Sequence, residues 1–356
     1  MVDRRKLGKV AQDNGFAFFE YCVNNNEIKE SKNIYYVSEK DNKNKRDLEP
    51  YYKNVVIADT FKHLILYELS SYLIVSHGIR DVLPSIMHTQ MRNNHTDIVY
   101  LQHGIVAMKK LGMNGNSYSG KIRKFVVSSE HERDIFIRNM NFRKDQIIVT
   151  GLARFDKLND ASSNLEDKEI LLMPTWRDWV NNSRATFLDS PFYTNYIDLL
   201  NDPKLHRVLE ENKLVLKFFP HFEIQTKYKN EFNFSHPRVK MVRLGEETVQ
   251  ELMQKSSLMI TDYSSVAFDF NYLNKPVMFY QFDIVDYLHY RGSYVNLKTD
   301  LFGDVTYSKE RLIKLLEKQA KNGFSYSKHQ IKLSRRYYKY QDRLNSERIY
   351  KEIEMN

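Results

Sequence analysis

The sequence contains one cysteine, Cys22, among its 356 residues. A single cysteine excludes an intrachain disulfide and a cysteine-based metal cage. No apolar run approaches the roughly 18–20 residues that a membrane-spanning helix needs. The opening segment MVDRRKLGKV also lacks the apolar core of a secretory signal. These absences favour a cytoplasmic protein.

Common nucleotide and metal motifs are also missing. The sequence has no Walker-type GxxxxGKS/T loop, no GxGxxG fingerprint and no HExxH pair. It has no Asp-x-Asp pair of the kind that holds a metal–diphosphate complex. We therefore expect no metal and no bound cofactor. Basic side chains and helix N-termini would then neutralise the charge of a bound phosphate.

Basic residues exceed acidic ones, with 54 Lys and Arg against 45 Asp and Glu, which gives a net charge of +9. Such an excess suits nucleic acid, anionic lipid or a polyanionic substrate, and the lack of a nucleic-acid-binding motif argues against the first. The stretch 98–129 contains no acidic residue. Five of its basic residues are candidate contacts for an anionic acceptor: Lys109, Lys110, Lys121, Arg123 and Lys124.

Short apolar runs alternate with helical patterns, which predicts an α/β fold with parallel sheets. The expected strands are 55–58, 72–76, 98–101, 125–127, 147–149, 170–173, 214–218, 258–261 and 277–280. The expected helices are 14–23, 130–139, 311–322 and a long basic helix at 328–354. We predict two doubly wound, Rossmann-like lobes, with a ligand cleft between them at the carboxyl ends of the strands.

The predicted domain boundaries follow from this pattern. We expect an N-terminal lobe at 1–155, a polar linker at 156–168, a C-terminal lobe at 169–325 and a basic helical tail at 326–356. A doubly wound lobe normally begins with a strand, whereas the first clear pattern here is a helix. The chain is therefore expected either to dispense with that strand or to be part of a longer polypeptide.

The segment Thr261-Asp262-Tyr263-Ser264-Ser265 joins a buried strand to a helix. The free N–H groups of a helix start, its dipole and two hydroxyls suit phosphate binding. The alternative is that Asp262 and Ser264 only cap the helix. Asp269, further along, would hold this loop or bind donor hydroxyls.

Other polar residues follow predicted strands. His103, in Gln102-His103-Gly104, and His221, after the strand that contains Lys217, suit phosphate binding or proton transfer, although a structural role is open for each. Arg177 suits two-pronged phosphate binding. A histidine in the first lobe and an arginine, a histidine and serines in the second are what transfer from a diphosphate nucleotide would need.

These motifs resemble the CDP-glycerol glycerophosphotransferase family, which includes teichoic-acid primases and polymerases. The resemblance rests on several segments: Ser76-His77-Gly78, Gln102-His103-Gly104, Pro174-Thr175-Trp176-Arg177-Asp178, Thr261-Asp262-Tyr263-Ser264-Ser265 and Asn345-Ser346-Glu347-Arg348-Ile349-Tyr350. It implies a two-lobed, GT-B-like fold whose second lobe holds the nucleotide. It also implies glycerol phosphate transfer without a tightly held metal, with His103 and His221 essential and Ser264 and Ser265 on the phosphate.

We therefore expect a transferase that moves glycerol phosphate from CDP-glycerol to a hydroxyl of a lipid-linked teichoic-acid or capsule-like acceptor and releases CMP. Arg177, Lys217, Asp262 and Asp269 are further candidate donor-binding residues. The alternatives are a transferase of the same fold that uses CDP-ribitol or a sugar nucleotide, and a non-catalytic docking module of a cell-envelope polymer complex.

The expected location is the cytoplasmic face of the membrane, with peripheral contact to anionic lipid and no nucleic-acid partner. Basic clusters at 109–124 and 328–351 favour such contact. Tyr337, Tyr338 and Tyr340 lie among the basic residues of the tail, and tyrosine is enriched at membrane interfaces.

Overall fold

The computed structural model describes residues 13–40, 45–88, 96–180, 183–228 and 230–354. The chain forms two compact units. Unit 1 contains the described residues up to Ile105, then Gly112–Lys157 and those from Arg336 onward, while unit 2 contains Val106–Leu111 and Leu158–Arg335. One boundary, after Lys157, falls in the range expected to be a linker. The expectation about an opening strand concerns residues before Asp13, outside the described residues.

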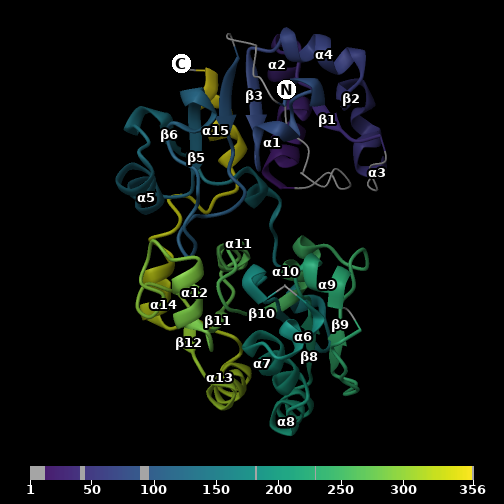
Figure 1. The fold of residues 1–356 in the computed structure, drawn as a ribbon, viewed down its shortest axis with the longest axis vertical. Helices are drawn as coiled ribbons and strands as arrows, with labels where there is room; N and C mark the ends of the chain where they lie inside the picture. Colours follow the sequence, from purple (N-terminus) through teal and green to yellow (C-terminus); the bar gives the residue numbers. More distant parts are fainter. Residues whose placement is uncertain (1–12, 41–44, 89–95, 181–182, 229, 355–356) are drawn as a thin grey trace. The chain divides into compact units, whose positions relative to one another are not determined.

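Unit 1 is built on a four-stranded parallel sheet in the order β3-β4-β5-β6 (Figure 1). A separate parallel pair, β1-β2, belongs to the same unit. The strands are β1 (Tyr36–Ser38), β2 (Val55–Ile57), β3 (Tyr72–Val75), β4 (Asp97–Tyr100), β5 (Ile122–Val127) and β6 (Ile147–Val149). The sequence predicted all of these strands except β1.

The helices of unit 1 come from both ends of the chain as well as from its first half. The helices are α1 (Asp13–Asn24), α2 (Asn26–Ser31), α3 (Lys45–Leu48), α4 (Phe61–Glu68), α5 (Glu130–Met140) and α15 (Asn345–Glu354). Helix α1 buries Phe16, Phe18 and Phe19, and α15 packs beside it (Figure 1). Helix α5 begins as predicted, because the Ser129 side chain accepts a hydrogen bond from the N–H of Glu132.

Unit 2 is built on a six-stranded parallel sheet in the order β12-β11-β10-β7-β8-β9. The strands are β7 (Lys168–Leu172), β8 (Leu214–Phe218), β9 (Val239–Met241), β10 (Ser256–Thr261), β11 (Val277–Tyr280) and β12 (Asp304–Thr306). The chain winds outward from β7 through β8 to β9, and then from β10 on the other side through β11 to β12. This is the order of a doubly wound nucleotide-binding sheet, whose ligands bind where the direction reverses, here at the carboxyl ends of β7 and β10.

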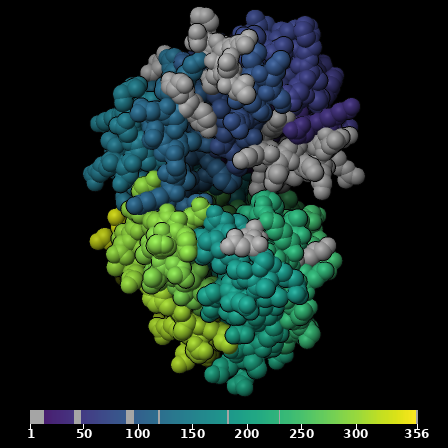
Figure 2. Space-filling model, viewed as in Figure 1, coloured from purple at the N-terminus to yellow at the C-terminus, as the bar shows by residue number. Residues whose placement is uncertain are grey.

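The helices of unit 2 cover an apolar core that centres on the buried residues Ile170, Leu216 and Ile260 of the sheet. They are α6 (Arg184–Leu188), α7 (Pro191–Leu200), α8 (Pro203–Glu211), α9 (Phe222–Tyr228), α10 (Val249–Lys255), α11 (Val266–Tyr272), α12 (Ile284–Tyr290), α13 (Lys309–Lys321) and α14 (Lys328–Ser334). Helices α8 and α13 lie side by side, and their teal and yellow-green surfaces adjoin in Figure 2.

The prediction of one long helix at 328–354 is wrong. The segment contains α14 and α15, separated by residues 335–344. A new helix begins at Asn345 because the Asp156 carboxylate accepts hydrogen bonds from the N–H groups of Asn345 and Ser346. The expected interfacial exposure of Tyr337 and Tyr338 is also wrong, since these side chains are 0% and 7% exposed.

Among the described residues, every helix is either too short or too polar to cross a bilayer.

Candidate active site

Two histidines meet at the carboxyl edge of the unit 1 sheet. His77 follows β3 and His103 follows β4, and these strands are neighbours in register. Their ring centres are 4.0 Å apart. Both rings face Asp13 at the start of α1, whose Oδ2 lies 2.7 Å from His103 Nδ1 and 3.4 Å from His77 Nε2. The His103 side chain is 57% exposed and that of His77 is 18% exposed, so His103 is the ring that a substrate can reach.

Arg154 completes this cluster. Its Nη1 donates to Asp13 Oδ1 and to the carbonyl oxygen of His103, both at 2.5 Å. Burial alone would raise the pKa of the Asp13 carboxyl. The positive charge of Arg154 and the two imidazoles outweigh that effect and hold the pKa of Asp13 well below its usual range. The cluster therefore presents an exposed imidazole backed by an ionised carboxylate.

Within the described ranges, one group of at least three His, Cys, Asp or Glu side chains has its potential metal-ligating atoms all within 4.8 Å of one another. It consists of Asp13, His77 and His103. Their geometry fits a hydrogen-bonded cluster better than a metal site. The 2.7 Å contact between Asp13 and His103 is a direct hydrogen bond, and Arg154 already neutralises the carboxylate. The absence of a metal stays a prediction, and proton transfer is the chemistry that this arrangement suits.

Arg177 lies among the loops at the switch point of unit 2. Its side chain is fully buried, with Nη2 2.9 Å from Asp262 Oδ2 and Nε 2.8 Å from Asp283 Oδ2. Nη1 donates to the carbonyl oxygen of Thr175 at 2.7 Å. Arg177 thus joins the loops that follow β7, β10 and β11. We expected its guanidinium to bind phosphate directly, but here it faces inward. A part for Arg177 in donor binding stays a prediction, and Arg177 would now act indirectly, by holding these loops in place.

Asp262 is the second cross-link at the switch point. Its Oδ1 accepts hydrogen bonds from the N–H groups of Thr175 and Tyr263, and its Oδ2 accepts one from the Tyr196 hydroxyl. Asp262 therefore fixes the shape of the loop that leads into α11. Asp269, in the first turn of α11, is buried.

Two serines stand at the start of α11. Ser264 Oγ accepts from the N–H of Val266 at 3.3 Å, a weak capping contact. Ser265 occupies the N-cap position without a capping bond from its side chain. Both are half-buried. Ser264 thus caps the helix weakly, as the alternative interpretation expected. The Ser265 hydroxyl does not cap the helix.

His221 and Lys217 lie near the end of β8. The ring of His221 is nearly parallel to that of Trp176, with centres 6.3 Å apart and planes at 10°. Its Nδ1 accepts from the N–H of Glu223 at 3.3 Å. Lys217 Nζ lies 2.8 Å from Glu169 and 2.6 Å from Glu247. The charge of Lys217 is therefore balanced by two carboxylates of unit 2, and its predicted contact with a donor stays a prediction.

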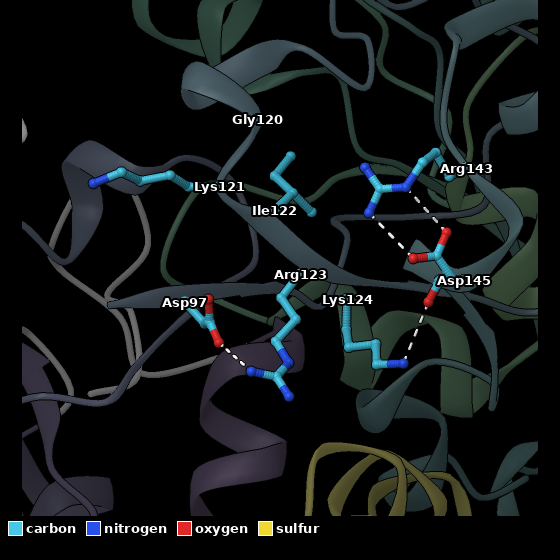
Figure 3. Close-up of a pocket in the computed structure, with 8 residues that line it drawn as sticks. All are labelled: Asp97, Gly120, Lys121, Ile122, Arg123, Lys124, Arg143 and Asp145. Atoms are coloured by element: carbon cyan, nitrogen blue, oxygen red, sulfur yellow. Dashed lines mark hydrogen bonds and ion pairs between the residues drawn. The ribbon is translucent and has the colours of Figure 1, made fainter. Parts of the chain in front are cut away.

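The five basic residues predicted to bind an acceptor are divided between the two units. Lys109 and Lys110 belong to unit 2. Lys121, Arg123 and Lys124 line an open hollow of about 410 Å³ in unit 1 (Figure 3). The hollow lies at the amino ends of β4 and β5, the edge of the sheet opposite to His103. Within it, Arg123 pairs with Asp97 at 2.5 Å, and Arg143 forms two hydrogen bonds to Asp145.

Sequence reasoning missed Asp13, Arg154 and Asp283. Asp13 is the first residue of α1 and offers no signal that it faces a histidine 90 positions away. Arg154 and Asp283 each come shortly after a strand, so the rule that found His103 and Arg177 applies to them too. The roles of Arg154 and Asp283 depend on their partners, Asp13 and Arg177, which are distant in sequence.

Two parallel α/β units with polar residues at their carboxyl edges define a GT-B-like protein. The model of the family described as CDP-Glycerol:Poly(glycerophosphate) glycerophosphotransferase matches residues 6–355, and the chain belongs to this family. The predicted fold class and family are thereby confirmed.

The chain is similar to several proteins of teichoic-acid synthesis. It is 31% identical over 358 residues to the minor teichoic acid biosynthesis protein GgaB of Bacillus subtilis (strain 168), covering 96% of this chain and 38% of GgaB. It is 27% identical to the teichoic acid glycerol-phosphate primase of the same strain, covering 74% of this chain and 69% of the primase. The chain therefore spans well under half of GgaB.

A solved structure of the wall teichoic acid polymerase TagF has the same fold. It superposes with a TM-score of 0.66 at 20% identity and covers 98% of this chain and 87% of that chain. At this identity the likeness concerns the fold.

Proposed function

We propose that the chain transfers glycerol phosphate from CDP-glycerol to a hydroxyl of a teichoic-acid acceptor and releases CMP. The observation that carries this proposal is the exposed His103 ring, hydrogen-bonded to an ionised carboxylate in a chain of this family. An imidazole so placed is suited to take a proton from an attacking hydroxyl. The alternative of a docking module gives no reason for this arrangement.

In the proposed reaction, the acceptor oxygen attacks the β-phosphorus of CDP-glycerol. The acceptor O–H bond breaks as the new O–P bond forms, the proton passes to His103, and CMP leaves with the electrons of the broken P–O bond. General base catalysis of this kind contributes about 10²–10⁴-fold to the rate.

We place the donor on unit 2, at the switch point between β7 and β10, as is usual for doubly wound sheets. Ser264, Ser265 and the N–H groups around them are the proposed phosphate contacts, and His221 would donate to a diphosphate oxygen. Arg177 and Asp262 would hold the loops in shape. Asp269 is proposed to support the site from its buried position, and Lys217 from the end of β8.

We further propose that the acceptor is lipid-linked and that the chain reaches it by peripheral contact with the cytoplasmic face of an anionic membrane. The partly exposed Lys121, Arg123 and Lys124 support this idea, because each basic residue near an anionic leaflet contributes about 1 kcal/mol.

A donor screen tests the proposed function. The purified full chain is incubated with a lipid-linked acceptor and either CDP-glycerol, CDP-ribitol or a sugar nucleotide, and nucleotide release is measured. We expect CMP release with CDP-glycerol, abolished in His103→Ala and kept in the exposed control His329→Ala. Release with CDP-ribitol alone would reassign the donor. Donor binding without release from any donor would favour the docking module.

A further inference from the structure

The backbone beside the His103 cluster adopts an uncommon conformation at two positions. Two non-glycine residues there have left-handed backbone angles, Asp13 with φ of 78° and Gln102 with φ of 67°. Such conformations cost about 1–3 kcal/mol each and persist only where the surroundings enforce them. Such conformations concentrate at functional sites. Their placement next to His103 therefore points to a role at this histidine.

The surroundings tie these two residues together. Asn14 Nδ2 donates to the carbonyl oxygen of Gln102 at 2.7 Å, and Asn14 Oδ1 accepts from the N–H of Arg154 at 3.0 Å. The Gln102 side chain donates to the carbonyl oxygen of Val126 at 2.8 Å. The start of α1, the loop after β4 and the segment after β6 are thus fixed against one another, and the carboxylate of Asp13 is held at His103.

We infer that Asp13 and Arg154 are positioning residues for His103. Asp13 Oδ2 accepts the Nδ1 hydrogen of the His103 ring, which leaves Nε2 as the unprotonated, outward nitrogen. Arg154 fixes the ring and its backbone together, because one Nη1 atom contacts both the carboxylate and the His103 carbonyl oxygen. A buried carboxylate on Nδ1 selects the reactive tautomer in the same way in hydrolases with a Ser-His-Asp triad.

His77 has a lesser part in this arrangement. Its Nε2 is 3.4 Å from the same carboxylate oxygen, against 2.7 Å for His103. Its less exposed ring packs against the His103 ring and limits how that ring can turn. When Nε2 of His103 takes the acceptor proton, the new imidazolium is stabilised by the Asp13 carboxylate, which remains ionised through its pair with Arg154.

This inference rests on the proposed function for its kinetic test but not for its spectroscopic one. The full chain is labelled with ¹⁵N-histidine, and two-bond ¹H–¹⁵N spectra report the tautomer of each neutral ring. Loss of one signal in His103→Ala assigns His103. We expect the Nδ1–H form in the wild type and a shift toward the Nε2–H form in Asp13→Asn. An unchanged His103 tautomer in Asp13→Asn would overturn the inference.

The kinetic test compares the same variants with CDP-glycerol. Asp13→Asn is expected to lower kcat by about 10²–10⁴-fold, with the KM for the donor little changed. Asp198→Asn, an exposed carboxylate variant on α7, serves as the control. Wild-type kcat in Asp13→Asn would contradict the positioning role. If the wild type itself shows no turnover with any donor, the proposed function fails while the tautomer still decides the inference.

A second variant keeps the test decisive if Asp13→Asn does not fold. Arg154→Lys retains the positive charge but replaces the planar, rigid guanidinium with an ammonium on a flexible stem, which holds Asp13 and the His103 carbonyl oxygen less firmly. We expect a lower kcat and a broadened His103 ring signal at an unchanged donor KM. An Arg154→Lys enzyme with wild-type kcat and spectrum would count against the inference.

Discussion

The two units use an arginine among carboxylates in opposite ways. In unit 1, Arg154 holds Asp13 against a histidine whose side chain is 57% exposed. In unit 2, Arg177 is completely buried between Asp262 and Asp283. Buried charges are tolerated when each is paired and hydrogen-bonded, so the Arg177 network suits the shaping of loops. A group that exchanges protons with a substrate must stay accessible, and that condition is met in unit 1.

The aromatic surroundings extend this contrast. The Tyr263 ring lies 4.9 Å from the Arg177 guanidinium, and its hydroxyl donates to Asp283 at 3.1 Å. Burial and the nearby Asp283 carboxylate raise the pKa of Tyr263 far above its usual value, so this hydroxyl serves as a hydrogen-bond donor. Unit 2 thus offers a rigid, closed network beneath the loop of Ser264 and Ser265.

The contrast between the two units predicts that turnover depends on His103 in unit 1. His103→Ala is expected to lower kcat by about 10²–10⁴-fold, the usual contribution of a general base. The unfolding free energy should change little, because the ring is more than half exposed. Turnover with CDP-glycerol and urea unfolding of the same preparation measure both quantities. A variant that keeps its turnover, or that loses it by unfolding, would contradict the assigned role.

Arg177→Met should show the reverse pattern, with stability as the main loss. Removing one partner of a buried ion pair costs about 3–5 kcal/mol because the remaining charges are left unpaired, and here two carboxylates lose their cation. Both tryptophans, Trp176 and Trp179, lie in unit 2, so their fluorescence during urea unfolding reports on that unit.

The pair of Arg184 with Glu231, in which the arginine side chain is 68% exposed, supplies the control. Arg184→Met should leave the urea midpoint nearly unchanged, since solvent screens exposed pairs. Equal midpoints for Arg177→Met and Arg184→Met would show that the buried network does not stabilise unit 2.

The sequence predicted much of the fold because buried parallel strands have a simple apolar pattern. The three missed strands, β1, β9 and β12, have three residues each. In the unit 2 sheet, β9 and β12 are the two edge strands. Short edge strands carry polar residues such as Lys240 and Asp304 and therefore lack that pattern. The tail was predicted as one helix because the start of α15 at Asn345 is fixed by Asp156, which is distant in sequence.

The candidate site was predictable where it follows from sheet topology. His103, His221, Arg177 and Asp262 follow parallel strands, so they gather at carboxyl edges. Burial was not predictable, because Arg177 is enclosed by Asp283, 106 positions away. The partners of His103 were missed for the same reason.

The pH dependence of stability tests whether the Asp13 carboxylate of unit 1 is ionised in the folded protein. The pKa of Asp13 is depressed below its ordinary value of 3.8. A depressed carboxyl pKa stabilises the fold above that ordinary value, and the contribution is lost as the pH falls through the folded pKa. The wild type should therefore exceed Asp13→Asn in stability at pH 7, by about 1.4 kcal/mol per unit of depression.

Hydrogen exchange of the β4 and β5 amides measures this difference between the two proteins as the pH is lowered from 7. The difference should be constant down to about pH 5 and shrink below pH 4. A difference that grows in acid would mean that the carboxyl is protonated in the folded protein, contrary to its pair with Arg154.

The smallest expected effect concerns the basic hollow at the opposite edge of the unit 1 sheet. Lys121 and Lys124 line it together with Arg123 and Arg143 (Figure 3), and both arginines are already paired with carboxylates. We therefore vary the two lysines, because replacing either arginine would also leave a carboxylate without its partner. At about 1 kcal/mol per residue, Lys121→Ala with Lys124→Ala should lower vesicle partitioning roughly thirtyfold at low salt.

Co-sedimentation with phosphatidylcholine vesicles, with and without phosphatidylglycerol, tests this prediction. Binding should require the anionic lipid and weaken as salt is added, because the Debye length is about 10 Å at 0.1 M and shortens further at higher ionic strength. A double alanine variant of Lys314 and Lys318, exposed on α13 of unit 2, controls for net charge. If both double variants lose binding equally, the attraction comes from overall charge and not from the hollow. If binding is indifferent to salt, the contact is apolar, and the electrostatic account of how this chain reaches a lipid-linked acceptor is wrong.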